Sequence, residues 1–149
     1  MGALVLALPG TLSAATAAST PTKPEAALLQ EMNRVRAQHG LPALHFDARL
    51  ARAARAHNEV MFANDVFTHG AFVERMRRFG VRDLQMAENL AWAVGASSSA
   101  RDVVAAWLAS PEHRRNLLGA SYHWVGISDL EGTFLGYGDA VIVTADFAG

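Results

Sequence analysis

The feature that most limits what this chain can fold into is the absence of cysteine from its 149 residues. Disulfide frameworks, cysteine-based zinc sites and cysteine nucleophiles are all excluded. A hydrophobic core must therefore hold the fold, and any metal must be bound by histidine and carboxylate side chains. Hydrophobic residues make up 51% of the chain and charged residues 18%, which indicates one globular domain. The formal net charge of -1 excludes the basic surface by which proteins bind nucleic acid.

The first 20 residues resemble a secretory leader. An apolar run is followed by small residues with Ala-x-Ala cleavage options at 15–18, although the usual basic start is missing. The run is broken by Pro9 and Gly10 and is too short to span a bilayer. We predict a signal-peptide-like leader over 1–20 and one domain over 21–149, with a disordered Ala/Ser/Thr tail as the alternative to the leader. Secretion without cysteine favours a bacterial source. No later segment is expected to cross a membrane.

Helical periodicity dominates the first half of the domain. Apolar residues recur at spacings of three and four over 25–40, 48–62 and 71–80, and again over 96–109. Thr22 and Glu25 are placed for a capping box, and Asp47 for an N-cap. His57 falls on the apolar face of the second helix, where a hydrogen-bonded core histidine is the more common outcome than a ligand.

Three strands are predicted in the second half of the domain. Apolar and polar residues alternate over 86–95 and 122–129, and 139–147 is rich in β-branched residues. The glycine-rich segment 130–138 is expected to be a hairpin loop, and 41–47 another loop. This order of elements predicts an α+β fold in which helices cover a small, mostly antiparallel sheet.

The segment WLASPEHRRNLL, residues 107–118, has the composition of a helix start. Ser110 is a good N-cap residue, Pro111 suits the first helical position, and Glu112 suits the first turn. Those three residues need no further explanation. His113 does, because the positive end of the helix dipole should keep its imidazole neutral and able to bind a metal or relay a proton.

Two further residues qualify as candidates for chemistry. Glu88 begins a strand whose same-side neighbours, Leu90 and Trp92, look buried, so its carboxylate must be paired unless it marks an exposed strand end. His69 lies in a turn-rich connection just before Gly70, where a lone histidine usually has no role.

Six segments in this order resemble the CAP domain, the SCP-like family of cysteine-rich secretory proteins, antigen 5 and pathogenesis-related 1, in its cysteine-free bacterial branch. They are LLQEMNRVRAQHGLPALHFDARLARAARAH, FTHG, AENLAWAVG, VVAAWLASPEHRRNLL, HWVGIS and VTADF. The resemblance covers residues 25–149 and implies a three-layer α-β-α sandwich. It also implies a cleft of two histidines and two acids that in several relatives binds a divalent metal such as zinc.

Carried over by position, the cleft consists of His69, Glu88 and His113, with Ser110 where an animal-type relative has its second acid. The metal ligands would be His69 and His113. Two imidazoles make only part of a catalytic zinc site, which normally has three protein ligands. Glu88 can complete it as a third ligand or orient one histidine.

We therefore expect a secreted or envelope protein, monomeric, that binds an extracellular ligand or partner, such as a lipid or cell-wall component, without catalysis. Weakly bound zinc or another divalent cation is the expected cofactor. The alternatives are a zinc-dependent hydrolase that uses the same cleft, and an extracellular carrier of small lipids.

Overall fold

A computed structural model describes residues 20–149, so all of the predicted leader except Thr20 lies outside the described residues. The elements, in chain order, are α1 (Lys23–Gln38), β1 (His45–Phe46), α2 (Ala48–Asn64), α3 (Phe72–Arg78), β2 (Met86–Val94), the short 3₁₀-helix η1 (Gly95–Ser98), α4 (Ala100–Ala109), α5 (Pro111–Leu117), β3 (Trp124–Phe134) and β4 (Tyr137–Ala148).

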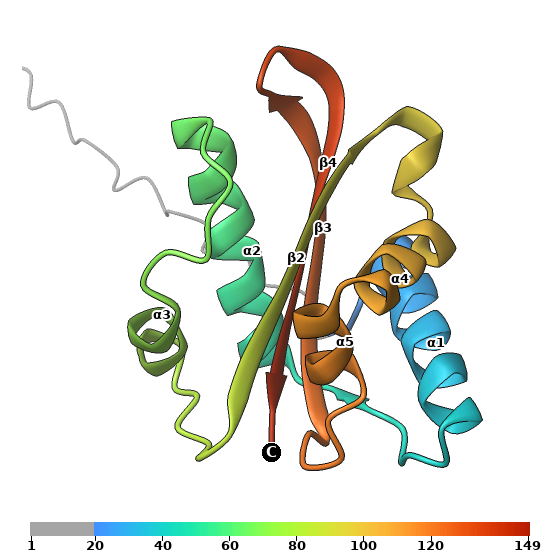
Figure 1. The fold of residues 1–149 in the computed structure, drawn as a ribbon. Helices are drawn as coiled ribbons and strands as arrows, with labels where there is room; N and C mark the ends of the chain where they lie inside the picture. The colour runs from blue at the N-terminus through green and yellow to red at the C-terminus, as the bar shows by residue number, and fades with distance from the viewer. Residues whose placement is uncertain (1–19) are drawn as a thin grey trace, which may run out of the picture.

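The sheet has the strand order β1-β3-β4-β2. Strand β1 pairs with β3 in parallel, and the other two pairings are antiparallel. Helices α2 and α3 cover one face of the sheet, and α1, α4 and α5 cover the other (Figure 1). This is the predicted three-layer α-β-α sandwich, with β2 at one edge of its middle layer.

The helices begin where their capping residues predict. The Thr22 amide donates to a Glu25 carboxylate oxygen (2.7 Å), and the Glu25 amide donates to the Thr22 hydroxyl (3.4 Å), which completes the capping box of α1. Asp47 caps α2 by accepting from the Arg49 and Leu50 amides. Ser99 caps α4, and the short helix η1 occupies 95–98 directly before it.

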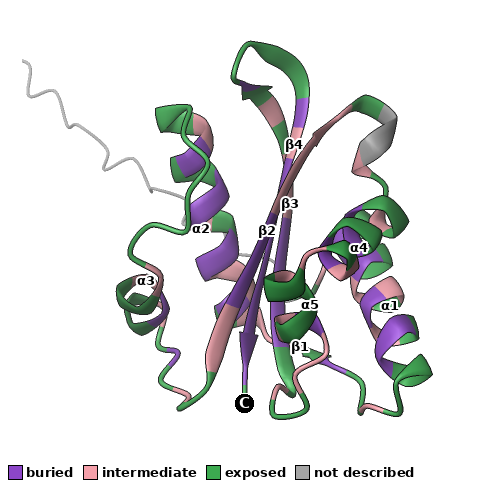
Figure 2. Cartoon of the chain, viewed as in Figure 1, coloured by how far each residue is buried: buried purple, intermediate pink, exposed green. Residues whose placement is uncertain are grey.

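Hydrophobic side chains fill the space on both sides of the sheet, so buried residues line its two faces (Figure 2). On the α2 face the packing is closest at Gly126 of β3. A Cβ atom added there would lie 2.0 Å from backbone atoms of Leu50 and Ala51, so only glycine permits this approach. None of the helices described over residues 20–149 is long and apolar enough to cross a membrane.

Two predicted loops are wrong in part. The segment 130–138 is mostly strand, and only Leu135 and Gly136 form the turn, at φ angles of 49° and 85°. Positive φ at both positions matches the two-residue turns that suit the twist of a hairpin. Gly132 belongs to β3 because the ring of Phe62 packs over it, 3.1 Å from where a Cβ would be. The loop 41–47 contains the two-residue strand β1, too short for a period-two pattern.

Candidate functional site

Glu88 lies near the start of β2, opposite Asp146 of β4 in the sheet register. Only 2% of its side chain is exposed. One carboxylate oxygen accepts from His69 Nδ1 (2.6 Å), and the other accepts from the Arg75 guanidinium. The sequence left open whether Glu88 is buried and paired or marks an exposed strand end. In the structure its carboxylate is buried and paired.

His69 lies between α2 and α3 with 57% of its side chain exposed. Because an ionised carboxylate can only accept, the imidazole donates from Nδ1 to Glu88. The following Gly70 has a φ of +56°, which turns the chain into α3. From α3, Arg75 donates to the His69 carbonyl (3.2 Å) and holds the backbone of this loop.

His113 lies in the first turn of α5, after the break between α4 and α5 at Ser110 and Pro111. Ser110 occupies the N-cap position and Pro111 begins the helix, as predicted, but the Ser110 side chain makes no capping hydrogen bond. Its hydroxyl instead pairs with His113 Nδ1 at 2.9 Å. Burial first, and then the charge of His69, lower the pKa of His113, while Glu112 opposes them. The lowered pKa favours the neutral imidazole at neutral pH, which is the state predicted for His113.

Strand β2 connects the His69–Glu88 pair with the His113–Ser110 pair. Asn89, next to Glu88, donates from its amide to the His113 carbonyl (3.0 Å). Asn116 of α5 donates to the Glu88 carbonyl (3.2 Å) and to the Asn89 side-chain oxygen (3.0 Å). We call His69, Glu88, Ser110 and His113 the histidine cluster. Neither asparagine was singled out in the sequence, although Asn89 belongs to the AENL motif.

Arg75, whose side chain is 10% exposed, and the buried Asp146 lie behind Glu88, and neither was predicted from the sequence. Arg75 Nη2 lies 3.9 Å from Asp146 Oδ1, and Asp146 is fully buried. Burial first, and then the Glu88 charge, raise the pKa of Asp146 well above its usual value, with Arg75 opposing. Asp146 stands in the VTADF motif, which was the only sequence signal for it.

His57 has the structural role that its position predicted. Its Nε2 donates to the Thr68 carbonyl at 2.7 Å, and 5% of the residue is exposed. Burial first, and then the Arg75 charge, lower its pKa, so the ring is neutral.

The side chains that could bind a metal ion in this cluster are the imidazoles of His69 and His113. Within residues 20–149 no group of three or more His, Cys, Asp or Glu side chains is arranged to hold a metal ion. Both oxygens of Glu88 are already occupied by His69 and Arg75. His69 and His113 each have Nδ1 engaged, and among the described residues neither Nε2 has a hydrogen-bond partner. Two imidazole nitrogens are fewer than the three protein ligands that a catalytic zinc site normally has.

The model of the CAP family, described as the cysteine-rich secretory protein family, matches residues 29–147. The chain belongs to this family. The protein YkwD of Bacillus subtilis is 28% identical over 121 residues, which are 78% of this chain and 46% of that protein. The membrane protein YlbC of the same bacterium is 32% identical over 71% of this chain and 31% of that protein. The chain thus spans less than half the length of these curated relatives.

Solved structures of CAP proteins have the same fold. An extracellular protein with an SCP domain from Bacillus anthracis superposes with a TM-score of 0.66 at 26% identity, over 87% of this chain and 45% of that one. An outer surface protein of Borrelia burgdorferi gives a TM-score of 0.67 at 23% identity, over 82% of this chain and 90% of that one. The CAP fold expected from the six sequence segments is therefore confirmed.

Proposed function

We propose that this CAP domain is an extracellular binding module whose histidine cluster receives a ligand or partner, with or without a weakly bound divalent cation. The observation that carries the proposal is that the imidazoles of His69 and His113 are each held by a hydrogen bond at Nδ1. Glu88 and Ser110 pair with the two Nδ1 atoms, and neither Nε2 has a hydrogen-bond partner among the described residues. In the tautomer that carries its proton on Nδ1, each ring offers the Nε2 lone pair to a cation or a hydrogen-bond donor.

His69 and His113 are the residues that would hold the cation, with water completing its shell. A bound cation would supply a positive charge that attracts anionic or carbonyl groups of a ligand. The carboxylate of Glu88 strengthens His69 as a donor by accepting its Nδ1 proton. Because Arg75 occupies the other oxygen, Glu88 is committed to this orienting task and is a poor third ligand or general base. Binding is therefore better supported than hydrolysis.

The location outside the cell is also part of the proposal. The Bacillus anthracis relative is described as extracellular and the Borrelia protein as an outer surface protein, whereas YlbC is described as a membrane protein. The apolar, Ala-rich start of the sequence agrees with export. In protein collected from culture medium, N-terminal sequencing should find a new terminus near Ser19; an intact Met1 would contradict the leader.

A zinc titration of thermal stability tests the site. With 1 mM zinc, the Tm should rise by about 3 °C, because a ligand that binds only the folded state stabilises it. The double variant His69→Ala/His113→Ala should lose this rise. The matched control His39→Ala/His123→Ala removes two exposed histidines outside the cluster and should keep it. Equal rises in both variants would assign the zinc to adventitious sites.

A further inference from the structure

Aromatic side chains gather at the end of the sheet where the β3–β4 hairpin turns. Four rings contact one another in the order Phe62, Phe134, Trp92 and Tyr137, with neighbouring centroids 5.9, 5.4 and 6.1 Å apart. They come from α2, β3, β2 and β4, so four elements bring them together. Trp92 lies four residues beyond Glu88 on β2, which is roughly 13 Å from the histidine cluster.

An irregular pairing in the hairpin turns Tyr137 toward the other rings. Gly132 pairs with Ala140 and Phe134 with Tyr137, so β4 has one more residue than β3 between these two pairs. A bulge of this kind re-aims the side chains beyond it, and it sets Tyr137 on the same face as Phe134. Phe134 is fully buried, Trp92 is half-buried and Tyr137 is 51% exposed. The outer two rings are therefore held by a buried one and remain accessible.

The charged groups beside these rings are acidic. Residues 130–141, which form the hairpin end, include Glu131 and Asp139 but no Lys, Arg or His. Both carboxylates are exposed, and neither makes an ion pair within the described residues. At the end of α2, the exposed Asp65 accepts from the Leu135 amide with one oxygen, which places its negative charge at the hairpin turn.

Basic side chains of the neighbouring elements do not cancel this charge. Arg55, the last arginine of α2, forms an ion pair with Glu59 (3.0 Å). Lys23 and Arg101 belong to α1 and α4, which cover the opposite face of the sheet (Figure 1). Accessible aromatic rings and unpaired carboxylates each attract cations, the rings through the negative potential of their faces.

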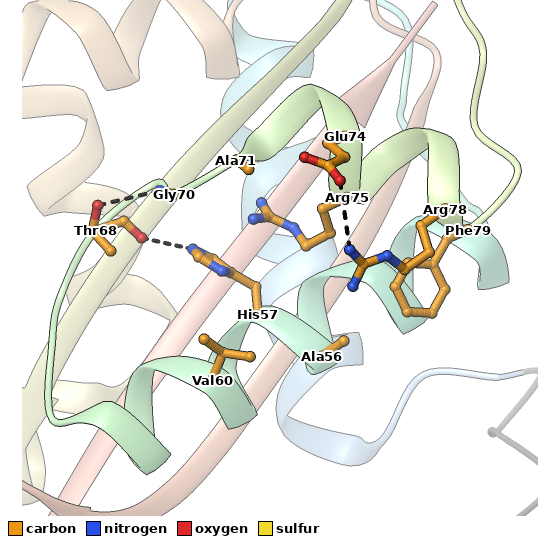
Figure 3. A pocket seen from close by; sticks show the side chains of 10 residues that line it. All are labelled: Ala56, His57, Val60, Thr68, Gly70, Ala71, Glu74, Arg75, Arg78 and Phe79. Carbon is orange, nitrogen blue, oxygen red and sulfur yellow. Dashed lines mark hydrogen bonds and ion pairs between the residues drawn. The ribbon is translucent and has the colours of Figure 1, made fainter.

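The cavity between α2 and α3 shows the contrast (Figure 3). Its charged side chains have both signs and are paired, Glu74 with Arg78 at 3.8 Å and Arg75 with Glu88. Charge therefore selects no partner for that cavity. At the hairpin end the exposed charge has one sign, which favours a positively charged partner.

We propose that the hairpin end binds a basic peptide segment of a partner protein. An arginine guanidinium stacks on the rings of Trp92 and Tyr137, and Asp65 and Asp139 complement its charge. Arginine suits this surface better than lysine because its planar group stacks on aromatic faces and also pairs with carboxylates. The function proposed for the histidine cluster does not use these residues, so the two can be tested separately.

The probe is the blocked peptide Ac-GRGRG-NH₂, and the reporters are the indole N–H signals of the three tryptophans in ¹H–¹⁵N NMR spectra. The peptide should move the Trp92 signal saturably, with a Kd on the order of 1 mM in about 20 mM salt and at least about three-fold weaker binding in about 200 mM salt. Trp107, buried and bonded to the Leu90 carbonyl (3.0 Å), and Trp124, 44% exposed at the start of β3, should not respond.

One peptide and three variants test the recognition of charge by the rings. The same peptide with citrulline for arginine is uncharged and should bind at least about five-fold more weakly. Tyr137→Leu keeps an apolar side chain without a ring face and should weaken binding at least about three-fold, whereas Tyr137→Phe should bind as the wild type does. Asp139→Asn should weaken binding about two-fold. Trp124→Leu removes an exposed ring far from the hairpin and is the control, and an unchanged Trp107 signal shows that each variant is folded.

An unmoved Trp92 signal, equal affinity for the citrulline peptide, or full affinity in folded Tyr137→Leu would each overturn the proposal. A neutral sugar such as chitotriose that moves the Trp92 signal when the peptide does not would assign the rings to sugar stacking instead. The variant His69→Ala/His113→Ala should bind the peptide normally, and lost binding there would contradict a separate surface. Failure of the peptide to bind would leave the zinc titration of the histidine cluster unaffected.

Discussion

Two arginines are buried on opposite sides of the sheet, and they are satisfied in different ways. Arg36 of α1 is fully buried, and its guanidinium donates to backbone carbonyls that close the α1 side of the fold. The acceptors and distances are Pro42 (2.9 Å), Leu117 (2.8 Å), Gly119 (3.0 Å) and Tyr122 (3.2 Å). Arg75 of α3 meets one carbonyl and one carboxylate, lies near a second carboxyl group, and leaves Nε without a partner among the described residues.

This difference distinguishes Arg36, which holds the fold together, from Arg75, which lies beside the histidine cluster. A buried cation whose donors end on carbonyls has nothing left to offer a ligand, and its charge is not coupled to a titrating group. A largely buried cation between two carboxyl groups opposes the rise in the pKa of Asp146 and, through its bond to Glu88, supports the orientation of His69. Incomplete pairing in the interior costs stability, so it calls for an explanation in terms of function.

Replacement of the scaffold arginine should have the largest effect. Arg36→Met leaves buried carbonyls without donors and should lower the free energy of unfolding by about 3 kcal/mol. The loss should be the same at pH 5 and pH 8, since no carboxyl group within residues 20–149 pairs with Arg36. Urea denaturation measures it, and Arg34→Met, which breaks only the exposed pair with Glu31, is the control. A loss below about 1 kcal/mol would show that water replaces the guanidinium.

Replacement of the site arginine should have a smaller effect that depends on pH. Arg75→Met removes the positive charge that opposes the raised pKa of Asp146, so the folded variant binds protons more tightly than the unfolded chain. Stability must then fall as pH rises, and we expect a loss of about 2 kcal/mol at pH 8 and less at pH 5. Arg78→Met, on the exposed side of α3, should change stability by less than about 0.5 kcal/mol. A loss as independent of pH as that of Arg36→Met would remove the distinction between the two arginines.

Local signals explain what could be predicted of the fold. The capping box of Thr22 and Glu25, the N-cap of Asp47 and the apolar periodicity of the long helices are all written in neighbouring residues. The hairpin was misjudged because Gly132 looks like loop until the Phe62 ring, distant in sequence, is seen to fill the space beside it.

The candidate site, too, depends on contacts between residues that are distant in the sequence. His69, Glu88 and His113 were found through resemblance to the CAP family, and the structure shows which partners hold each of them. Arg75 was missed because it stands among other arginines on a short helix, with nothing local to mark it as buried. Its partners lie on β2 and β4, and only the paired strands bring Glu88 and Asp146 together.

The smallest effect should come from Asp129 of β3, a carboxyl group on the Arg36 side whose pKa is raised. Burial first, and then the nearby charges of Glu25 and Glu131, raise the pKa of Asp129 to about 6. The folded state therefore holds this proton more tightly than the unfolded chain, and stability is lost as pH rises from about 4 to about 6.

Asp129→Asn should remove that loss. We expect it to raise the free energy of unfolding by about 1 kcal/mol at pH 7, discounted because the group is partly exposed, and to change nothing at pH 3.5. Urea denaturation at the two pH values measures the difference, with the exposed substitution Glu59→Gln as control. A gain of the same size at both pH values would mean that packing is responsible. A gain confined to neutral pH would show that the α1 side, where Arg36 is fully paired, also carries an unpaired charge. Whether a buried charge is paired would then differ from group to group on the same face of the sheet.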